Sequence, residues 1–249
     1  MEKLYNSTNL ETHNVDGLPI PVNPKWKKVV INLSGGADSA ILAFLVCKII
    51  EENNYDCQVD VLSYIRMWKT RPWQYSIAEN VYNWLKNRFP EIIGERHTMY
   101  MPPELELSAA GPINGRAGDV VIGVSYSRYL QFQNKYDAIY NATTKNPTGL
   151  EHSRRVLARD TPKYEIDTLA SADENGWFLT PFRLTEKDWI IKQYANNNVL
   201  DLLNTTRSCE QEWDDLTYEN YVEGQFVPEC GECFWCEERN WGKQKAGIK

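Results

Sequence analysis

Short apolar runs alternate along the chain with segments in which apolar residues recur every three or four positions. The run at 28–33 predicts a buried strand, and the next segment, 38–52, places Ile41, Leu45 and Ile49 on one face of a helix. The alternation continues, predicting strands at 59–65, 97–101, 137–143 and 177–182 and helices at 74–89, 120–135 and 185–197. Strands that are joined through helices favour a mainly parallel sheet with helices on both faces. The pattern therefore predicts a doubly wound α/β fold.

The ends of the chain depart from this alternation. Residues 1–25 are polar and proline-rich, which predicts an N-terminal arm, and the α/β pattern occupies 26–204. Residues 205–249 hold four of the six cysteines, so we expect a separate metal-binding segment there. Within the α/β part, Thr185 with Asp188 three residues later predicts a capping box at the start of the last helix.

Composition and charge narrow the class of protein. Of the 249 residues, 42% are apolar and 24% charged, which is typical of a globular domain. The net charge of −7 argues against a large nucleic-acid-binding face. No stretch approaches the roughly 20 apolar residues of a membrane span, and the N-terminus lacks the apolar core of a secretory signal. We therefore expect a cytoplasmic protein in a reducing compartment.

The turn SGGADS, between the first strand and the first helix, carries candidate chemistry. Ligands of doubly wound sheets bind where strands end and helices begin. Gly35 and Gly36 allow close approach of the backbone to a ligand, and the first amides of a helix bind anions. Ser34 and Ser39 add hydroxyl donors, and Asp38 is suited to holding loop amides or magnesium. The turn differs from both the GxxxxGK[ST] and the GxGxxG motifs, yet it predicts a phosphate site.

The cysteines fall into two groups. Cys47 and Cys57 lie in a predicted helix and strand, where they suit small core positions. The other four are clustered toward the C-terminus: Cys209, Cys230, Cys233 and Cys236. Four thiolates, three of them in a CxxCxxC run, match a closed tetrahedral zinc site that holds the tail in place. An iron–sulfur cluster and redox or sulfur-carrier cysteines are the other interpretations of this spacing.

SGGADS resembles the SGGxDS pyrophosphate loop of the PP-loop ATPases, which have an adenine nucleotide alpha hydrolase-like fold. Members of that group activate a carbonyl or carboxylate oxygen by adenylation, after which a nucleophile displaces AMP. The resemblance implies that ATP with Mg²⁺ is bound by Leu33, Ser34, Gly35, Gly36, Asp38, Ser39, Ser63 and Tyr64. It also implies a catalytic role for Asp38.

Three later stretches narrow the resemblance: LTPFRLTEKDWI at 179–190, TTRSCE at 205–210 and CGECFWCEERNWG at 230–242. They resemble the 7-cyano-7-deazaguanine synthase family, of which the chain would be a divergent member. The family implies ATP-dependent conversion of 7-carboxy-7-deazaguanine with ammonia to the amide and then the nitrile, and a Zn²⁺ held by the four cysteines. It also implies that Lys187 binds ATP and acts in catalysis by neutralising phosphate charge in the transition state. We expect those small molecules as partners, neither a membrane nor a nucleic acid, and a homodimer as one assembly.

The middle of the chain differs from the family. Ser63 and Tyr64 stand where an Asp-Tyr-Gly-Gln stretch is usual, and Arg116 precedes an alanine in place of asparagine. Asn146 stands roughly where the family has an aspartate, so Arg116 and Asn146 are the weakest candidates for substrate contact. The differences leave two alternatives open: a PP-loop enzyme that modifies another acceptor such as tRNA, or a non-catalytic ATP-binding module of a larger assembly.

Three further features of the sequence have weaker implications for function. The basic run HSRRVLAR at 152–159 is either a solvated charged face or a segment that closes over phosphates. Three of the nine tryptophans, Trp84, Trp177 and Trp189, fall at positions that suit core packing better than base stacking. The three histidines show no metal-ligand spacing and no partnered nucleophile, so none is assigned a catalytic role.

Overall fold

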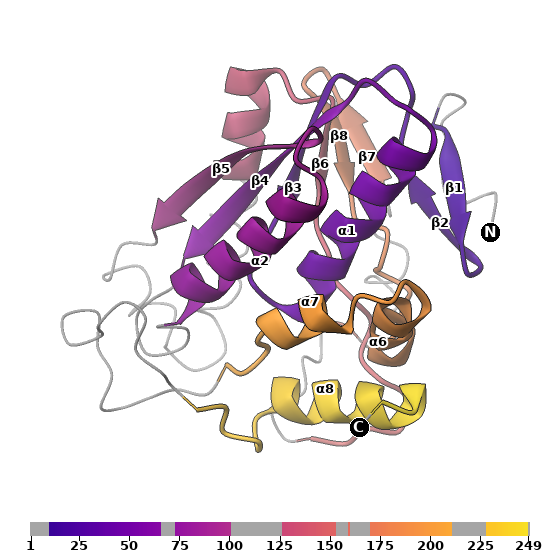
Figure 1. The fold of residues 1–249 in the computed structure, drawn as a ribbon, viewed down its shortest axis with the longest axis vertical. Helices are drawn as coiled ribbons and strands as arrows, with labels where there is room; N and C mark the ends of the chain where they lie inside the picture. The colour runs from indigo at the N-terminus through magenta and orange to yellow at the C-terminus, as the bar shows by residue number, and fades with distance from the viewer. Residues whose placement is uncertain are drawn as a thin grey trace.

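The computed structural model describes residues 10–65, 73–100, 126–152, 159, 170–210 and 228–248. Its main sheet contains β3 (Lys28–Asn32), β4 (Gln58–Ile65), β5 (Ile93–Tyr100), β6 (Ala138–Tyr140), β7 (Ala170–Asp173) and β8 (Gly176–Leu179). The strand order is β5-β4-β3-β6-β8-β7 (Figure 1). Neighbouring strands from β5 to β8 are parallel, and only the pairing of β7 with β8 is antiparallel. The predicted α/β fold with a mainly parallel sheet is confirmed.

Helices cover both faces of this sheet. The helices that lie wholly within the described residues are α1 (Ala37–Glu52), α2 (Gln74–Arg88), α6 (Lys187–Asn196), α7 (Leu200–Thr205) and α8 (Phe234–Ala246). Alternate residues of β3 face opposite sides, as the pleat requires. Val29 and Ile31 join the large core that includes α1, whereas Val30 packs with Leu130 of the helix at 126–134. The sheet is therefore doubly wound, with α1 and α2 in front and the pink helix behind in Figure 1.

Most helix and strand boundaries agree with the sequence pattern, but the capping box predicted at Thr185 is wrong. The helix expected at 120–135 is confirmed over 126–134, and its earlier residues lie outside the described part. Thr185 does not cap α6, which begins at Lys187 with Glu186 at the N-cap and no side-chain cap hydrogen bond. The Thr185 backbone is engaged elsewhere, because its carbonyl accepts a hydrogen bond from the Lys145 N–H at 2.9 Å.

The N-terminal residues contribute more structure than an arm would. β1 (Thr12–Val15) and β2 (Leu18–Pro21) form an antiparallel hairpin. Ile20 and Val22 at its end are buried in the main core. Cys47 and Cys57 are buried as predicted. The tryptophans expected to pack also contact this core: Trp84, Trp177 and Trp189.

A buried carboxylate joins three strands at the end of the sheet where β4 begins. The Asp60 side chain is fully buried and accepts hydrogen bonds from the Tyr136 hydroxyl at 2.6 Å and the Glu95 N–H at 2.9 Å. The Lys28 ammonium lies 2.9 Å from the same carboxylate. Burial alone raises the pKa of Asp60, but these hydrogen bonds outweigh it and leave that pKa below its ordinary value of 3.8.

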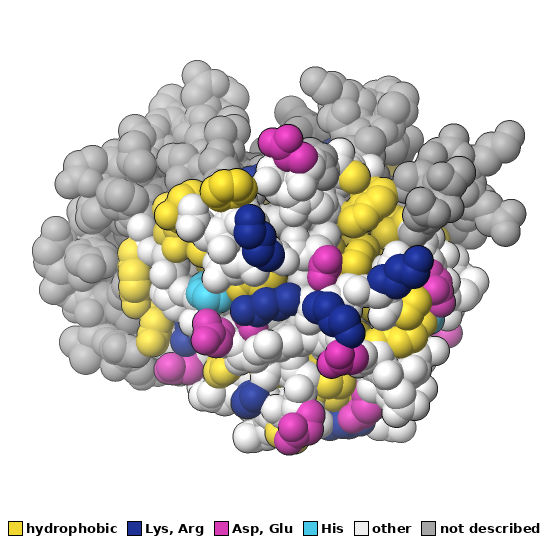
Figure 2. All heavy atoms as spheres, turned by 90° about the horizontal axis from the view of Figure 1, so that it is seen from above, with side chains coloured by type: hydrophobic (Ala, Val, Ile, Leu, Met, Phe, Trp, Pro, Cys, Tyr) yellow, Lys and Arg dark blue, Asp and Glu magenta, His cyan; other side chains and the backbone are white. Residues whose placement is uncertain are grey.

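The distribution of surface charge is relevant to nucleic-acid binding, and the length and polarity of the helices are relevant to membrane spanning. On the face that Figure 2 shows, basic and acidic side chains lie next to one another, with no continuous basic surface across the coloured residues. Within the described ranges, every helix is too short or too polar to cross a bilayer.

Candidate functional site

The SGGADS turn lies at the carboxyl end of β3 and is held by its own serines. The Ser39 hydroxyl accepts a hydrogen bond from the Ser34 N–H at 3.1 Å and donates one to the Gly36 carbonyl at 3.1 Å. The Ser34 hydroxyl accepts one from the Gly36 N–H at 3.2 Å. Gly36 is the N-cap of α1 and offers no side-chain cap. The first amides of α1 are thus left to an external acceptor, which is the requirement for an anion site.

Gly35 is required by both its dihedral angle and its neighbours. Its φ is +80°, in the left-handed region that favours glycine. A Cβ at this position would lie 2.9 Å from Ile77 Cγ2 and 3.0 Å from the Ala78 nitrogen of α2. The Gly35 carbonyl also accepts a hydrogen bond from the Arg207 N–H at 3.0 Å. The loop is therefore pressed against α2 on one side and tied to the C-terminal third of the chain on the other.

Lys187 and Asp38 form a buried ion pair beside this loop. The Lys187 ammonium lies 2.6 Å from both carboxylate oxygens of Asp38, and its side chain is only 3% exposed. Asp38 is in the first turn of α1 and Lys187 is the first residue of α6. The N-terminal ends of two helices thus meet at the pair, and both contribute positive potential.

A second buried carboxylate extends the pair into a row of alternating charges. Glu238 of α8 is 1% exposed, and its Oε2 lies 3.5 Å from the Lys187 ammonium. Its Oε1 accepts a 2.9 Å hydrogen bond from Arg159, whose guanidinium also lies 3.5 Å from Asn146 Oδ1. Two cations therefore face two carboxylates, and the row is neutral until a ligand enters.

Close packing of α8 on α6 puts Glu238 in this place. A Cβ on Gly242 of α8 would lie 2.7 Å from Lys187 Cγ and 3.0 Å from the Lys187 carbonyl oxygen. Only a residue without a side chain allows this approach. The Arg239 guanidinium donates to the carbonyls of Thr206 at 3.2 Å and Leu203 at 3.0 Å, so α8 is also fixed to the end of α7.

The four C-terminal cysteines converge as their spacing predicts. The sulfurs of Cys209, Cys230, Cys233 and Cys236 all lie within 4.8 Å of one another and could hold one metal ion. The Sγ–Sγ distance is 3.6 Å for Cys209 and Cys230 and 3.9 Å for Cys230 and Cys236. Hydrogen bonding to Cys209 raises the pKa of the Cys233 thiol to about 12, and the same crowding raises that of Cys236. A bound cation would relieve this crowding by stabilising the thiolates.

A cavity of about 140 Å³ lies between the SGGADS turn and the cysteine cluster. Its walls come from the loop, the start of α2, the segment before Cys209 and α8: Ser34, Gly36, Asp38, Trp73, Ile77, Arg159, Lys187, Arg207, Ser208, Cys209, Glu210 and Trp235. Hydroxyls, cations and two carboxylates, those of Asp38 and Glu210, line one space beside a helix N-terminus. This arrangement can bind an anion and neutralise charge that develops on it.

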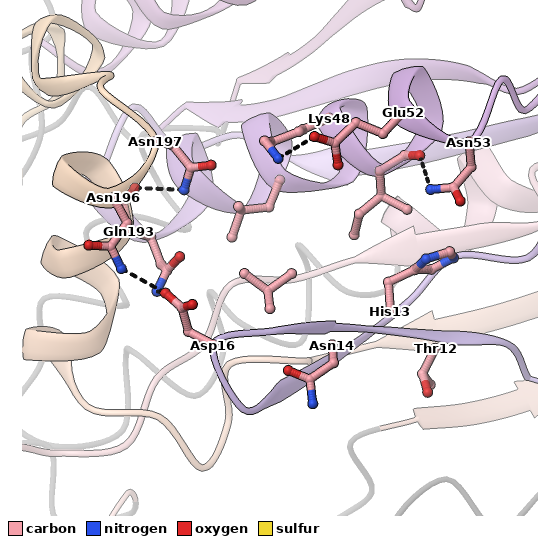
Figure 3. A pocket seen from close by; sticks show the side chains of 13 residues that line it. Thr12, His13, Asn14, Asp16, Lys48, Glu52, Asn53, Gln193, Asn196 and Asn197 are labelled. Atoms are coloured by element: carbon pink, nitrogen blue, oxygen red, sulfur yellow. Dashed lines mark hydrogen bonds and ion pairs between the residues drawn. The ribbon is translucent and has the colours of Figure 1, made fainter.

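A larger cavity of about 540 Å³ lies between the β1–β2 hairpin and the ends of α1 and α6 (Figure 3). Its polar side chains mostly satisfy one another, since Gln193 and Asn196 donate to Asp16 at 2.9 and 2.7 Å. Two helix C-termini face this space, and their negative potential disfavours phosphate. We therefore assign the candidate site to the smaller cavity.

Three described residues expected at the site, Leu33, Ser63 and Tyr64, are not among those that line this cavity. Leu33 is buried and its N–H donates to the Leu62 carbonyl at 2.7 Å, which continues the pairing of β3 with β4. Ser63 is fully buried and Tyr64 half-buried near the end of β4, and neither lines the 140 Å³ cavity. Arg116 lies outside the described residues.

The sequence pattern missed several residues that the fold brings to the site. They are Trp73, Arg207, Glu238 and Trp235. Nothing in the sequence pattern indicated a role for Glu238, because the helix α8 that carries it was not predicted. Lys187, with which Glu238 pairs, is 51 residues earlier in the chain. The only available signal for Arg207 was its place two residues before a metal-site cysteine.

No protein-family model matches the sequence, and no curated protein matches it. Among solved structures, one similar chain is the U34-tRNA thiolase NcsA from Methanococcus maripaludis with its [4Fe-4S] cluster, with a TM-score of 0.49 and 14% identity over 87% of this chain. The match spans 64% of the thiolase chain. Another is NAD+ synthetase from Burkholderia pseudomallei, with a TM-score of 0.38 and 14% identity over 90% of this chain and 83% of that one.

Proposed function

We propose that the protein is a PP-loop enzyme that uses ATP to activate a carboxylate and then joins it to ammonia. The proposed acceptor is 7-carboxy-7-deazaguanine, and the products are its amide and the nitrile, 7-cyano-7-deazaguanine. The observation that carries the ATP chemistry is the SGGADS loop with the buried Lys187 ammonium 2.6 Å from Asp38. The acceptor is proposed from the sequence resemblance at 179–190, 205–210 and 230–242.

The residues of the site divide the work between binding and charge neutralisation. The free amides of the first turn of α1, together with the two serine hydroxyls, would bind the phosphates. Asp38 would take up magnesium that accompanies ATP, which leaves the Lys187 ammonium to face the phosphate oxygens. Because Glu238 stays 3.5 Å from Lys187, the buried ammonium would keep a counter-charge after Asp38 turns away.

The proposed reaction has two stages, formation of the amide and then formation of the nitrile. A carboxylate oxygen attacks a phosphorus of ATP, forming a C–O–P linkage and releasing pyrophosphate or ADP. Ammonia then attacks the carboxyl carbon, the C–O bond breaks, and AMP or phosphate leaves with that oxygen and the amide remains. Activation of the amide oxygen by a second ATP, followed by loss of that oxygen with AMP or phosphate and of the amide protons, gives the nitrile. The protein contributes mainly by holding the reactants together and by neutralising charge on the leaving group.

We propose zinc as the ion of the cysteine cluster. A tetrahedron with metal–sulfur bonds of about 2.3 Å has edges of about 3.8 Å. The two measured Sγ–Sγ distances of 3.6 and 3.9 Å match that edge. Four protein ligands leave no open coordination position, so the ion would hold the start of α8 and through it Glu238. A cubane cluster binds each sulfur to a different iron, which requires a wider arrangement of the thiolates.

The test is mass spectrometry of a reaction that contains the protein, ATP, magnesium, ¹⁵N-ammonium and 7-carboxy-7-deazaguanine. We expect ¹⁵N-labelled amide or nitrile from the unmodified protein and none from Asp38→Ala. Asp188→Ala is the matched control, since Asp188 is in the first turn of α6 but pairs with Lys192 on the surface at 3.2 Å. It should retain the activity.

Other outcomes would separate the alternatives. Protein that binds ATP and metal but converts none of the acid would contradict the proposed acceptor. ATP cleavage that depends on added tRNA would then favour a tRNA-modifying enzyme, and ATP binding without cleavage would favour a non-catalytic module.

A further inference from the structure

Two aromatic rings and an arginine form one wall of the candidate site. The Arg207 guanidinium carbon lies 3.9 Å from the centre of the Trp73 ring, so the cation covers the ring face. Trp73 is only 4% exposed, and it also packs with Cys209 and Cys233 of the cysteine cluster. Trp73, Arg207 and Trp235 all line the 140 Å³ cavity beside the phosphate loop. Planar π-systems and a planar cation are therefore concentrated between the loop and the cysteines.

The position of Arg207 is fixed at both ends. Its backbone N–H donates to the Gly35 carbonyl of the phosphate loop at 3.0 Å. Its guanidinium donates to the Pro228 carbonyl at 2.6 Å, on the segment that leads to Cys230. The side chain is half-buried and rests on Trp73, so little rotamer freedom remains for a ligand to remove.

We propose that Arg207, stacked on Trp73, is the binding surface for the acceptor and selects a planar heteroaromatic acid. The proposal rests on the function proposed above and names the residues that would choose its acceptor. A guanidinium that covers one ring can stack its other face on the ring of a second planar group. Arg159 at the same cavity supplies a second cation suited to a carboxylate.

The size of the cavity supports this assignment over one to the nucleotide. Sites for drug-sized ligands measure about 300–1,000 Å³, whereas this cavity measures about 140 Å³. The space suits one small ring system next to the phosphates better than the whole of ATP. Its place between Gly36 and Cys209 would put the acid's carboxylate beside the phosphate loop.

The experiment is calorimetric titration of the metal-loaded protein with 7-carboxy-7-deazaguanine in the presence of a non-hydrolysable ATP analogue. Arg207→Lys keeps the positive charge but loses the planar face that stacks. We expect this variant to weaken binding of the acid at least tenfold and to leave the affinity for the ATP analogue within twofold. Cyclohexanecarboxylate, an acid without a planar ring, should bind at least tenfold more weakly than the deazaguanine acid to the unmodified protein.

Two further variants serve as a control and as an independent test of the stacking surface. Lys245→Gln removes a cation–tryptophan contact away from the cavity, on α8, where the Lys245 ammonium lies 5.9 Å from the Trp241 ring, and should change neither affinity. Trp73→Leu removes the stacked ring while keeping the guanidinium, and should weaken acid binding as well. If Arg207→Lys lowered the metal content, Trp73→Leu with full metal content would decide the question.

The proposal and the proposed function fail in different ways. Unchanged affinity for the acid in both Arg207→Lys and Trp73→Leu would overturn the assignment of this wall, even in an enzyme that produces the nitrile. A loss of affinity for the ATP analogue alone would assign Arg207 to phosphate binding and would also overturn it. An acid that binds through Arg207 but is never converted would contradict the proposed reaction and keep the binding surface.

Discussion

Replacing Asp38 by alanine should destabilise the protein more than replacing its partner Lys187 by methionine. The Lys187 side chain is 3% exposed and Asp38 is 22% exposed. Removing the carboxylate therefore strands a cation that water cannot reach. Removing the cation leaves a carboxylate that can turn toward solvent, and methionine still fills the space of the lysine stem.

The expected loss in free energy of unfolding depends on which charged groups stay near the remaining member of the pair. Breaking a buried pair by deleting one member costs about 3–5 kcal/mol. In Asp38→Ala the Glu238 Oε2 still lies 3.5 Å from the ammonium, so we expect a loss at or below the lower end of that range, about 2–3 kcal/mol. In Lys187→Met, Glu238 keeps its 2.9 Å bond to Arg159, and we expect about 1 kcal/mol.

Thermal unfolding of the metal-loaded protein would measure both losses. A loss of 1 kcal/mol lowers the Tm of a protein of this size by about 2–4 °C. Asp38→Ala should therefore lower it by about 4–12 °C and Lys187→Met by about 2–4 °C. The double variant should lose less than the sum of the two, because it no longer strands a charge. Equal losses, or a larger loss for Lys187→Met, would refute the burial argument.

Three other changes test separate parts of the structure. Gly35→Ala places a Cβ at 3.0 Å from the Ala78 nitrogen with φ at +80°, so thermal unfolding should show a loss of about 1–3 kcal/mol, and calorimetry weaker ATP binding. Cys233→Ser should release the metal, measured by elemental analysis, and lower the Tm because the start of α8 loses its anchor. The pKa of Asp60 is lowered in the fold, so its stabilising contribution is present above the unfolded pKa of about 3.9 and is lost as pH falls through the folded value. Tyr136→Phe removes one of its hydrogen bonds, and acid unfolding followed by circular dichroism should move to higher pH.

The sequence predicted the parts of the site that are local in the chain. The SGGADS loop could be identified because its two glycines and the serines on either side of them are close together in the sequence. The structure gives Gly35 the positive φ that glycine favours. Likewise, the CxxCxxC run indicated convergence of the thiols, because two-residue spacers allow neighbouring cysteines to reach one ion.

What could not be predicted depends on contacts between distant segments. Lys187 is the first residue of α6, where a lysine suits a solvated surface as well as a ligand. Its burial results from α8, whose approach depends on a single residue, Gly242. Glu238 and Arg207 reach the site through the same packing. The hairpin β1–β2 was missed for another reason, since a four-residue strand that contains Pro19 and Pro21 gives little strand signal.

The most direct test of the account is the fate of the acceptor's own oxygen. In a reaction with [¹⁸O₂]carboxylate-labelled 7-carboxy-7-deazaguanine, ammonium, ATP and magnesium, activation of the carboxylate requires that one ¹⁸O leave with the phosphorus. The account predicts ¹⁸O in AMP or in phosphate, one ¹⁸O for each amide and two for each nitrile that accumulates, and none with Asp38→Ala. Unlabelled AMP and phosphate alongside ATP cleavage would contradict it, because ATP would then be consumed without activating the acid.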